Sequence, residues 1–160
     1  MSRHPSTGCS CSAGRRAILR GIGAFTLVGL APAAIAQSRP AEIVQPATPG
    51  RAAFMARAFE MRRLAIERGD QSYGAVVVRR DRIVGEGVSA VVTARDPTAH
   101  AERQAIGDAL RRLGATDLAG CELYGTSRAC PMCETAAAQA RIAGMVHGSD
   151  LIDAGVPRVR

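Results

Sequence analysis

Two short clusters of metal-binding side chains, far apart in the sequence, most constrain how this chain can fold. His100 and Glu102 form the first cluster, and Cys130 and Cys133 follow after 27 intervening residues. One imidazole and two thiolates are a known ligand set for a catalytic zinc ion, which keeps its fourth position for water. We therefore expect the fold to bring the clusters together, with one Zn²⁺ per chain bound by His100, Cys130 and Cys133.

Glu102 is the candidate for proton transfer at this site. Zinc lowers the pKa of bound water, so that hydroxide becomes available near neutral pH to attack an electron-poor ring carbon. Expulsion of an amine then needs a group that takes a proton from the water and delivers it to the departing nitrogen. A non-ligating Glu beside a His/Cys/Cys zinc site is the signature of zinc deaminases. The pattern thus predicts hydrolytic deamination by zinc-bound hydroxide, with Glu102 as the proton shuttle.

Helix-start signals accompany both clusters. Asp96-Pro97 predicts a helix that begins just before His100, because Asp is a favoured N-cap and Pro is favoured in the first turn. Pro131 predicts that a second helix begins at the first cysteine. His100 and Glu102 are two residues apart and do not share a helix face. Both can reach one metal ion only if it lies beyond the end of the first helix.

The remaining pattern predicts helices alternating with strands. Apolar residues recur at the helical period in some segments and at the strand period in others. The expected elements are a helix at about 51–68, strands at 75–78 and 82–88, the helix near residue 100, a strand at 121–126, a helix from 130 to about 141, and strands at 144–147 and 156–160. This order predicts an α/β fold, a three-layer α/β/α sandwich with a mixed sheet of four to five strands.

The first 36 residues have the features of an export signal. Arg15-Arg16 precede an uncharged segment, residues 21–36, which ends in Ala34-Ile35-Ala36, a suitable cleavage site. We predict a twin-arginine-type signal, removed on export to the periplasm or the medium, so that no membrane attachment remains. A basic Sec-type signal or an uncleaved anchor is the alternative. Residues 37–50 are predicted to be a flexible lead-in, and residues 51–160 the zinc deaminase domain.

Composition excludes several function classes. All 21 residues counted as Lys or Arg are Arg, which rules out a Schiff-base lysine and a P-loop lysine. Removal of residues 1–36 takes away four of these arginines and none of the 14 acidic residues, which leaves a net charge of +3. Such a modest charge argues against nucleic acid as a partner, because phosphate contacts usually need a dense basic patch.

Three stretches carry a resemblance to a known family. Residues 96–102, residues 121–133 and the strand-like segment 73–78 resemble the cytidine and deoxycytidylate deaminase superfamily, most of all its guanine deaminase and tRNA adenosine deaminase branch. The resemblance covers roughly residues 51–150. It implies a cytidine deaminase-like fold, the zinc ligands and proton shuttle named above, a homo-oligomer, and substrate contacts by Ser89 and by the backbone N–H of Ala101.

This chain departs from the branch at positions that bear on the substrate. Arg128-Ala129 stands where the branch usually has Glu-Pro, Ser89 where it usually has Asn, and Tyr73 where it usually has Phe. A serine hydroxyl cannot offer the paired donor and acceptor of an amide, so recognition of a base edge by Ser89 would differ. We expect a small-molecule substrate, an amino-substituted nucleobase or nucleoside of guanine or cytosine type.

Two other functions stay open at this point. One is a non-catalytic metal-binding or ligand-binding protein on a deaminase scaffold, which the departures at Ser89 and Arg128 would suit. The other is a periplasmic redox protein that uses the Cys-x-x-Cys pair as a dithiol. A purely structural zinc site is disfavoured, because it would need a fourth protein ligand and His147 is the only other histidine after the signal.

Overall fold

A computed structural model describes residues 41–159 of the 160-residue chain, so the predicted export signal lies outside the described part. Within those residues the elements are α1 (Arg51–Glu67), β1 (Gly74–Arg79), β2 (Arg82–Val88), α2 (Ala101–Leu113), β3 (Glu122–Gly125), α3 (Pro131–Gln139), β4 (Gly144–His147) and β5 (Ile152–Gly155). No helix in residues 41–159 combines the length and the apolar character needed to cross a bilayer.

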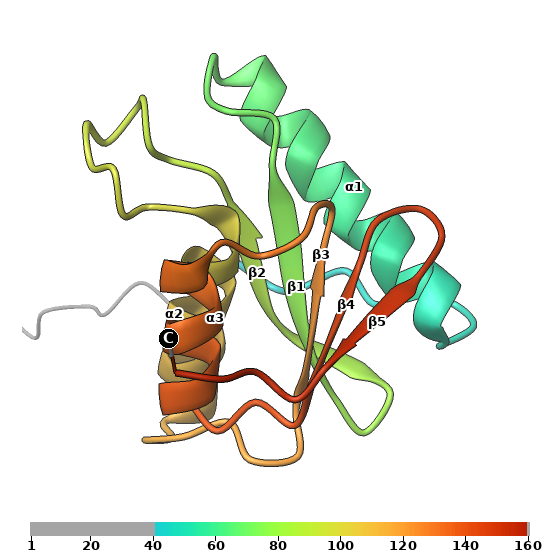
Figure 1. Ribbon diagram of the computed structural model, residues 1–160. Coiled ribbons are helices and arrows are strands. Elements are labelled where there is room, and N and C mark those ends of the chain that lie inside the picture. The colour runs from blue at the N-terminus through green and yellow to red at the C-terminus, as the bar shows by residue number, and fades with distance from the viewer. Residues whose placement is uncertain (1–40, 160) are drawn as a thin grey trace, which may run out of the picture. The chain divides into compact units, whose positions relative to one another are not determined.

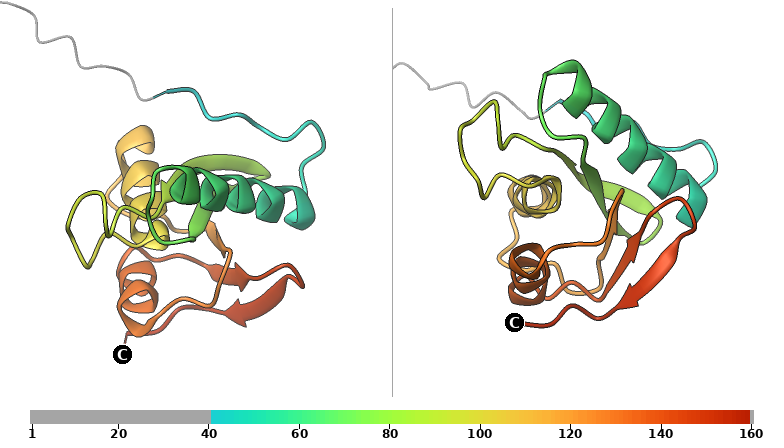
Figure 2. Two further views of the ribbon diagram at one scale, coloured as in Figure 1. Left: turned by 90° about the horizontal axis from the view of Figure 1, so that it is seen from above. Right: turned by 45° about the horizontal axis from the view of Figure 1, so that its top comes forward.

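The five strands form one mixed sheet in the order β2-β1-β3-β4-β5. Neighbouring strands are antiparallel except β3 and β4, which are parallel and joined through α3. Helix α1 covers one face of the sheet, and α2 and α3 lie side by side on the other (Figure 1; Figure 2). The predicted three-layer α/β/α sandwich is therefore confirmed.

Strand β1 supplies both hydrophobic layers, because alternate side chains of a strand point to opposite faces of the sheet. Ala75 and Val77 belong to the cluster beneath α2 and α3. Val76 and Val78 belong to the cluster beneath α1, together with the buried side chains Phe54, Met55, Ala58 and Met61. The central strand is thus buried on both faces, as the apolar run in its sequence indicates.

Glycines let the helices lie directly on the sheet. A Cβ atom added to Gly87 of β2 would stand 1.9 Å from the carbonyl oxygen of Ala101, at the start of α2. One added to Gly85 would stand 2.5 Å from the carbonyl oxygen of Ala105, and one added to Gly74 would meet the α1 backbone at 2.2 Å. Contacts this short exclude any larger side chain, so Gly85 and Gly87 determine how closely α2 approaches the sheet.

At both ends of the described residues, the structure differs from what the sequence predicts. Part of the predicted flexible lead-in is fixed to the domain: the Gln45 amide donates to Ile83 O of β2 at 2.8 Å and accepts from Ile83 N–H at 2.9 Å, and Ile43 is buried. The last strand is β5 rather than residues 156–160. Pro157 has no N–H to donate to a sheet ladder, which accounts for the absence of a strand from Val156 to Val159.

We predict that Gly87→Ala displaces the start of α2. The added methyl group overlaps the backbone of α2, and overpacking of this kind costs about 1–3 kcal/mol of the free energy of unfolding. Urea unfolding followed by circular dichroism measures this change. Gly107→Ala, within α2, is the matched control, because its Cβ would meet only the end of the Arg111 side chain, at 3.3 Å. Equal stability of the Gly87→Ala protein and the native protein would contradict the prediction.

Candidate zinc centre and pocket

Helix α2 begins later than we predicted from Asp96-Pro97. Asp96 does not cap the helix: its Oδ1 accepts hydrogen bonds from the N–H and the hydroxyl of Thr98, both at 2.8 Å. The N-cap of α2 is His100, whose carbonyl oxygen accepts the helical bond from Gln104 N–H at 3.0 Å. His100 has extended backbone angles, φ −67° and ψ 151°, and so lies outside the helix, whereas Glu102 lies in its first turn.

The second cluster has the same local structure, an N-cap residue followed by a residue in the first turn of a helix. Cys130 is the N-cap of α3, with φ −72° and ψ 165°, Pro131 is the first helical residue, and Cys133 lies in the first turn. Helix N-termini carry a positive partial charge and free N–H groups, which favour thiolate over thiol and attract anions. Both N-caps are therefore predicted metal ligands, and the metal position lies beyond the ends of both helices, as the spacing of His100 and Glu102 requires.

The three predicted ligands converge with distances that suit zinc. His100 Nδ1 lies 3.7 Å from Cys130 Sγ and 3.5 Å from Cys133 Sγ, and all three ligand atoms lie within 4.8 Å of one another. One nitrogen and one sulfur at zinc-bond lengths and the tetrahedral angle would lie about 3.6 Å apart. Among residues 41–159 no fourth ligand atom joins this group. The donor set therefore fits zinc with a position left open.

Glu102 lies beside the ligands without belonging to their group. Its side chain is buried, and the Cys133 thiol donates a hydrogen bond to Glu102 Oε2 over 3.6 Å. Burial raises the pKa of Glu102, against the opposing effects of hydrogen bonds and of the nearby His100. Burial is also the main cause that raises the pKa of the Cys133 thiol, followed by repulsion from Glu102. Gly125 lies next to this side chain, since a Cβ there would be in ordinary van der Waals contact with Glu102 Cγ, at 3.8 Å.

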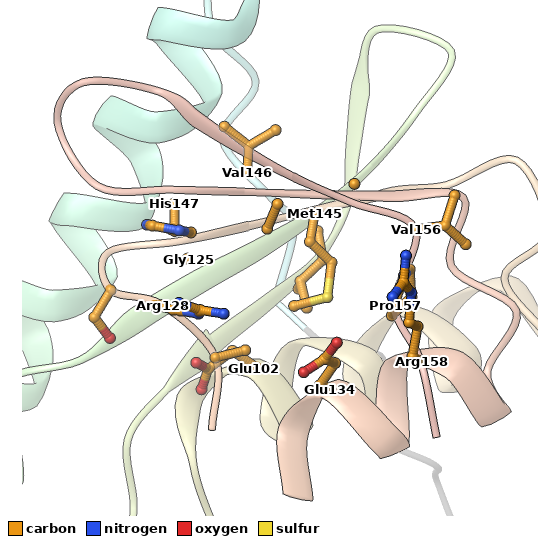
Figure 3. Close-up of a pocket in the computed structure, with 15 residues that line it drawn as sticks. Glu102, Gly125, Arg128, Glu134, Met145, Val146, His147, Val156, Pro157 and Arg158 are labelled. Atoms are coloured by element: carbon orange, nitrogen blue, oxygen red, sulfur yellow. The ribbon is translucent and has the colours of Figure 1, made fainter. Parts of the chain in front are cut away.

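A pocket of about 360 Å³ opens next to Glu102. Strands β3 and β4 supply Leu123, Met145 and His147, and α3 supplies Glu134 (Figure 3). The segment after β5, including Val156, Pro157 and Arg158, also lines the pocket, and so does Arg128 of the loop before α3. Neither Arg158 nor Glu134 is a site residue that the sequence predicts. No local pattern could have found them, because the chain segments that carry them meet only in the folded sheet.

Ser89 and Ala101, the predicted substrate contacts, both lie in buried positions. The Ser89 hydroxyl donates to Asp70 Oδ1 at 2.8 Å, and Ser89 is not among the residues that line the pocket. Ala101 is the first residue of α2 and is fully buried in the cluster beneath the helices. Nothing in these contacts tests a role in substrate binding, so both assignments stay predictions.

Asp70 is a residue that sequence analysis missed. Its carboxylate accepts hydrogen bonds from the Ser89 hydroxyl, from Val92 N–H at 3.1 Å, and from the N–H and hydroxyl of Thr93, both at 2.8 Å. Burial raises the pKa of Asp70, but these hydrogen bonds outweigh it and hold the pKa well below its usual range. Asp70 thus fixes the loop that leads from β2 toward His100.

We predict that His100→Ala, Cys130→Ala and Cys133→Ala each lower the affinity for zinc by at least tenfold, because each removes one of three ligands. Metal content of the purified full chain and competition with a zinc chelator measure the effect. Cys121→Ala is the matched control: Cys121 is a buried free cysteine outside the ligand group, and this variant should bind about one zinc ion per chain. Full zinc retention by Cys133→Ala would rule out the assigned ligand set.

We predict that Asp70→Ala frees the loop at residues 89–96. A carboxylate with a depressed pKa stabilises the fold above its unfolded pKa, about 3.9, and this stabilisation is lost only as the pH falls through the lower folded value. Slow amide exchange at Thr93 should therefore persist at pH 4 in the native protein and be absent from Asp70→Ala. Asp117→Ala, which removes the acceptor of the Ala119 N–H, is the control. Unchanged exchange at Thr93 in Asp70→Ala would refute this role.

Several known proteins are similar to this chain. Over 100 residues the chain is 38% identical to a tRNA-specific adenosine deaminase of Aquifex aeolicus, covering 62% of this chain and 66% of the relative. Over 82 residues it is 43% identical to a guanine deaminase of Bacillus subtilis, covering 51% and 53%. The X-ray structure of guanine deaminase from Bacillus subtilis superimposes with a TM-score of 0.58 at 38% identity, covering 60% of this chain and 62% of that one.

The chain spans about half to two thirds of the length of these relatives. Residues 50–149 match the family described as the cytidine and deoxycytidylate deaminase zinc-binding region. The family and the His/Cys/Cys ligand set together confirm the zinc cofactor that the sequence predicts. Because the matched region takes in more than half of the chain and contains all three ligands, this protein belongs to that family.

Proposed function

We propose that this protein is a zinc-dependent hydrolytic deaminase of a small amino-substituted heterocycle, a nucleobase or nucleoside of guanine or cytosine type. The observation that carries the proposal is the position of Glu102. This buried carboxylate borders the pocket, lies 3.6 Å from the sulfur of Cys133, and stays outside the group of three ligand atoms. A non-catalytic binding site would need no acid at this point.

His100, Cys130 and Cys133 are the residues that would hold the zinc ion. When bound, zinc supplies a Lewis acid that makes water a nucleophile near neutral pH. Glu102 accepts a proton from the attacking water, and a carbon–oxygen bond forms at the ring carbon that bears the amino group. Glu102 then delivers that proton to the amino nitrogen. The carbon–nitrogen bond breaks, ammonia leaves, and the ring keeps the oxygen, so that atoms and charge balance.

A small substrate is favoured over a nucleic acid. The pocket volume of about 360 Å³ lies at the lower end of the range typical of small-molecule sites, about 300–1,000 Å³. The predicted export signal would separate the protein from cytoplasmic tRNA. Among the relatives, the guanine deaminase of Bacillus subtilis is named for a free base, and the deaminase of Aquifex aeolicus for tRNA. We therefore propose a free base or nucleoside, and a periplasmic or secreted location.

We predict that Glu102→Gln binds about one zinc ion per chain but releases ammonia at least about 100-fold more slowly, because proton transfer by a positioned group typically contributes that much. Ammonia release from guanine, adenine, cytosine and their nucleosides measures activity and substrate class together. Glu67→Gln, at an exposed carboxyl of α1, is the control. Unchanged turnover by Glu102→Gln would refute the assigned role.

The same preparations test the two alternatives. A native protein that binds zinc but releases no ammonia from any of these compounds would favour a non-catalytic binding protein. Cys130 and Cys133 are free thiols in the structure, and Cys133 is fully buried, which suits a metal ligand better than an accessible redox dithiol. A metal-free protein isolated with these cysteines oxidised would favour the redox function instead.

A further inference from the structure

The mouth of the pocket next to Glu102 carries two arginines. Arg128 and Arg158 line the same pocket as Glu102, but both arginines are exposed whereas Glu102 is 7% exposed. Figure 3 shows the two arginines on opposite sides of the pocket, with Glu102 and Glu134 on the helices between them. Glu102 thus lies at the buried end of the pocket, and the two exposed arginines lie at its rim.

The fold holds both arginines at this rim. Arg128 is two residues before Cys130, in the short loop from β3 to α3 whose far end is the helix N-cap. Arg158 follows Pro157, which is buried and so anchors the segment after β5 against the domain. Neither arginine therefore belongs to a free tail.

The charge of these two side chains is available to a ligand. Within residues 41–159 neither Arg128 nor Arg158 has a carboxylate oxygen within 4.0 Å, whereas Arg57, Arg112 and Arg141 each pair with an acidic side chain. A guanidinium group presents several N–H donors in a planar fork that matches the oxygens of a phosphate or a carboxylate. Half-buried His147, on β4, adds a further donor to the lining.

We infer that the substrate of this pocket is a base or nucleoside that carries, in addition, an anionic oxygen group, which Arg128 and Arg158 bind at the mouth. The inference rests on the proposed function, which puts the reacting ring carbon next to Glu102. A ring in that position shares the pocket with both arginines, so its distal substituent can face them. A phosphate or a carboxylate there meets guanidinium groups, and the hydroxyl of a neutral nucleoside gains much less from them.

Matched substrates with one ring and different substituents test this inference. Ammonia release is measured with the zinc-loaded full chain on cytidine and guanosine, on their 5′-monophosphates, and on the 5′-carboxylates in which the terminal carbon of the sugar is oxidised. We expect kcat/KM for an anionic compound to exceed that of its neutral nucleoside at least about tenfold, mainly through KM. A preference for the monophosphate or for the carboxylate identifies the group. Equal kcat/KM values for all three would overturn the inference.

Arg128→Gln and Arg158→Gln test the assigned residues. Both arginines are exposed, so these substitutions leave the core intact. Each should lower the ratio of kcat/KM between the anionic and the neutral compound severalfold, and the double variant should remove the preference. Arg68→Gln changes the charge by the same amount at an exposed site outside the pocket lining and should keep the native ratio. A full preference in the double variant would overturn the assignment.

Equilibrium binding separates failure of this inference from failure of the proposed function. Calorimetric titration of zinc-loaded Glu102→Gln with cytidine, guanosine and their 5′-monophosphates requires no turnover. We expect at least tenfold tighter binding of a monophosphate, weakened when NaCl is raised from 0.05 to 0.5 M because salt screens exposed charges. Ammonia release from neutral compounds without any anion preference would overturn this inference alone. Absence of ammonia release from every compound would overturn the proposed function, whichever ligand binds.

Discussion

The arrangement of this protein depends on two helix N-termini that end at one group of ligand atoms. His100 and Cys130 are both N-caps with extended backbone angles, so their side chains project beyond the helices and not from their flanks. Cys133 completes the group from the first turn of α3, and all three ligand atoms lie within 4.8 Å of one another. Because metal bonds tolerate errors of only about 0.2 Å, the two helices must be positioned accurately relative to each other.

The sheet provides this accuracy. Helix α2 follows β2 and α3 follows β3, and only β1 separates these strands in the sheet. Gly87 leaves no space between β2 and the first turn of α2, since any Cβ would overlap the carbonyl of Ala101. Hydrogen bonds to Asp70 also hold the loop that joins β2 to α2. Close packing of this kind allows the helices only one position relative to the sheet. A metal site with three ligands requires such fixed positions.

Much of this could be predicted from the sequence, for identifiable reasons. Helical and strand periods located seven of the eight elements, because each buries one apolar face or stripe. The ligands were recognisable because zinc restricts both residue types and spacing. Asp96 was misassigned as an N-cap because its short side chain bonds to the backbone two residues on, a local alternative to capping that has the same sequence signal. Arg128 was recognisable as a departure that bears on the substrate, but Glu134 and Arg158 were beyond prediction, since only the folded sheet brings them into one pocket lining.

On the proposed function, the residues that react and the residues that recognise the substrate lie in different parts of the site. The ligands and Glu102 sit at the starts of α2 and α3, where Glu102 and Cys133 are buried. Arg128 and Arg158 are exposed and pair with no carboxylate among the described residues, so a change of either costs the fold little. Substrate preference can therefore differ between members of such a family while the reacting groups stay in place. On the proposed function, Arg128-Ala129 before Cys130 then marks a change in the rim of the pocket and not a loss of the reacting groups.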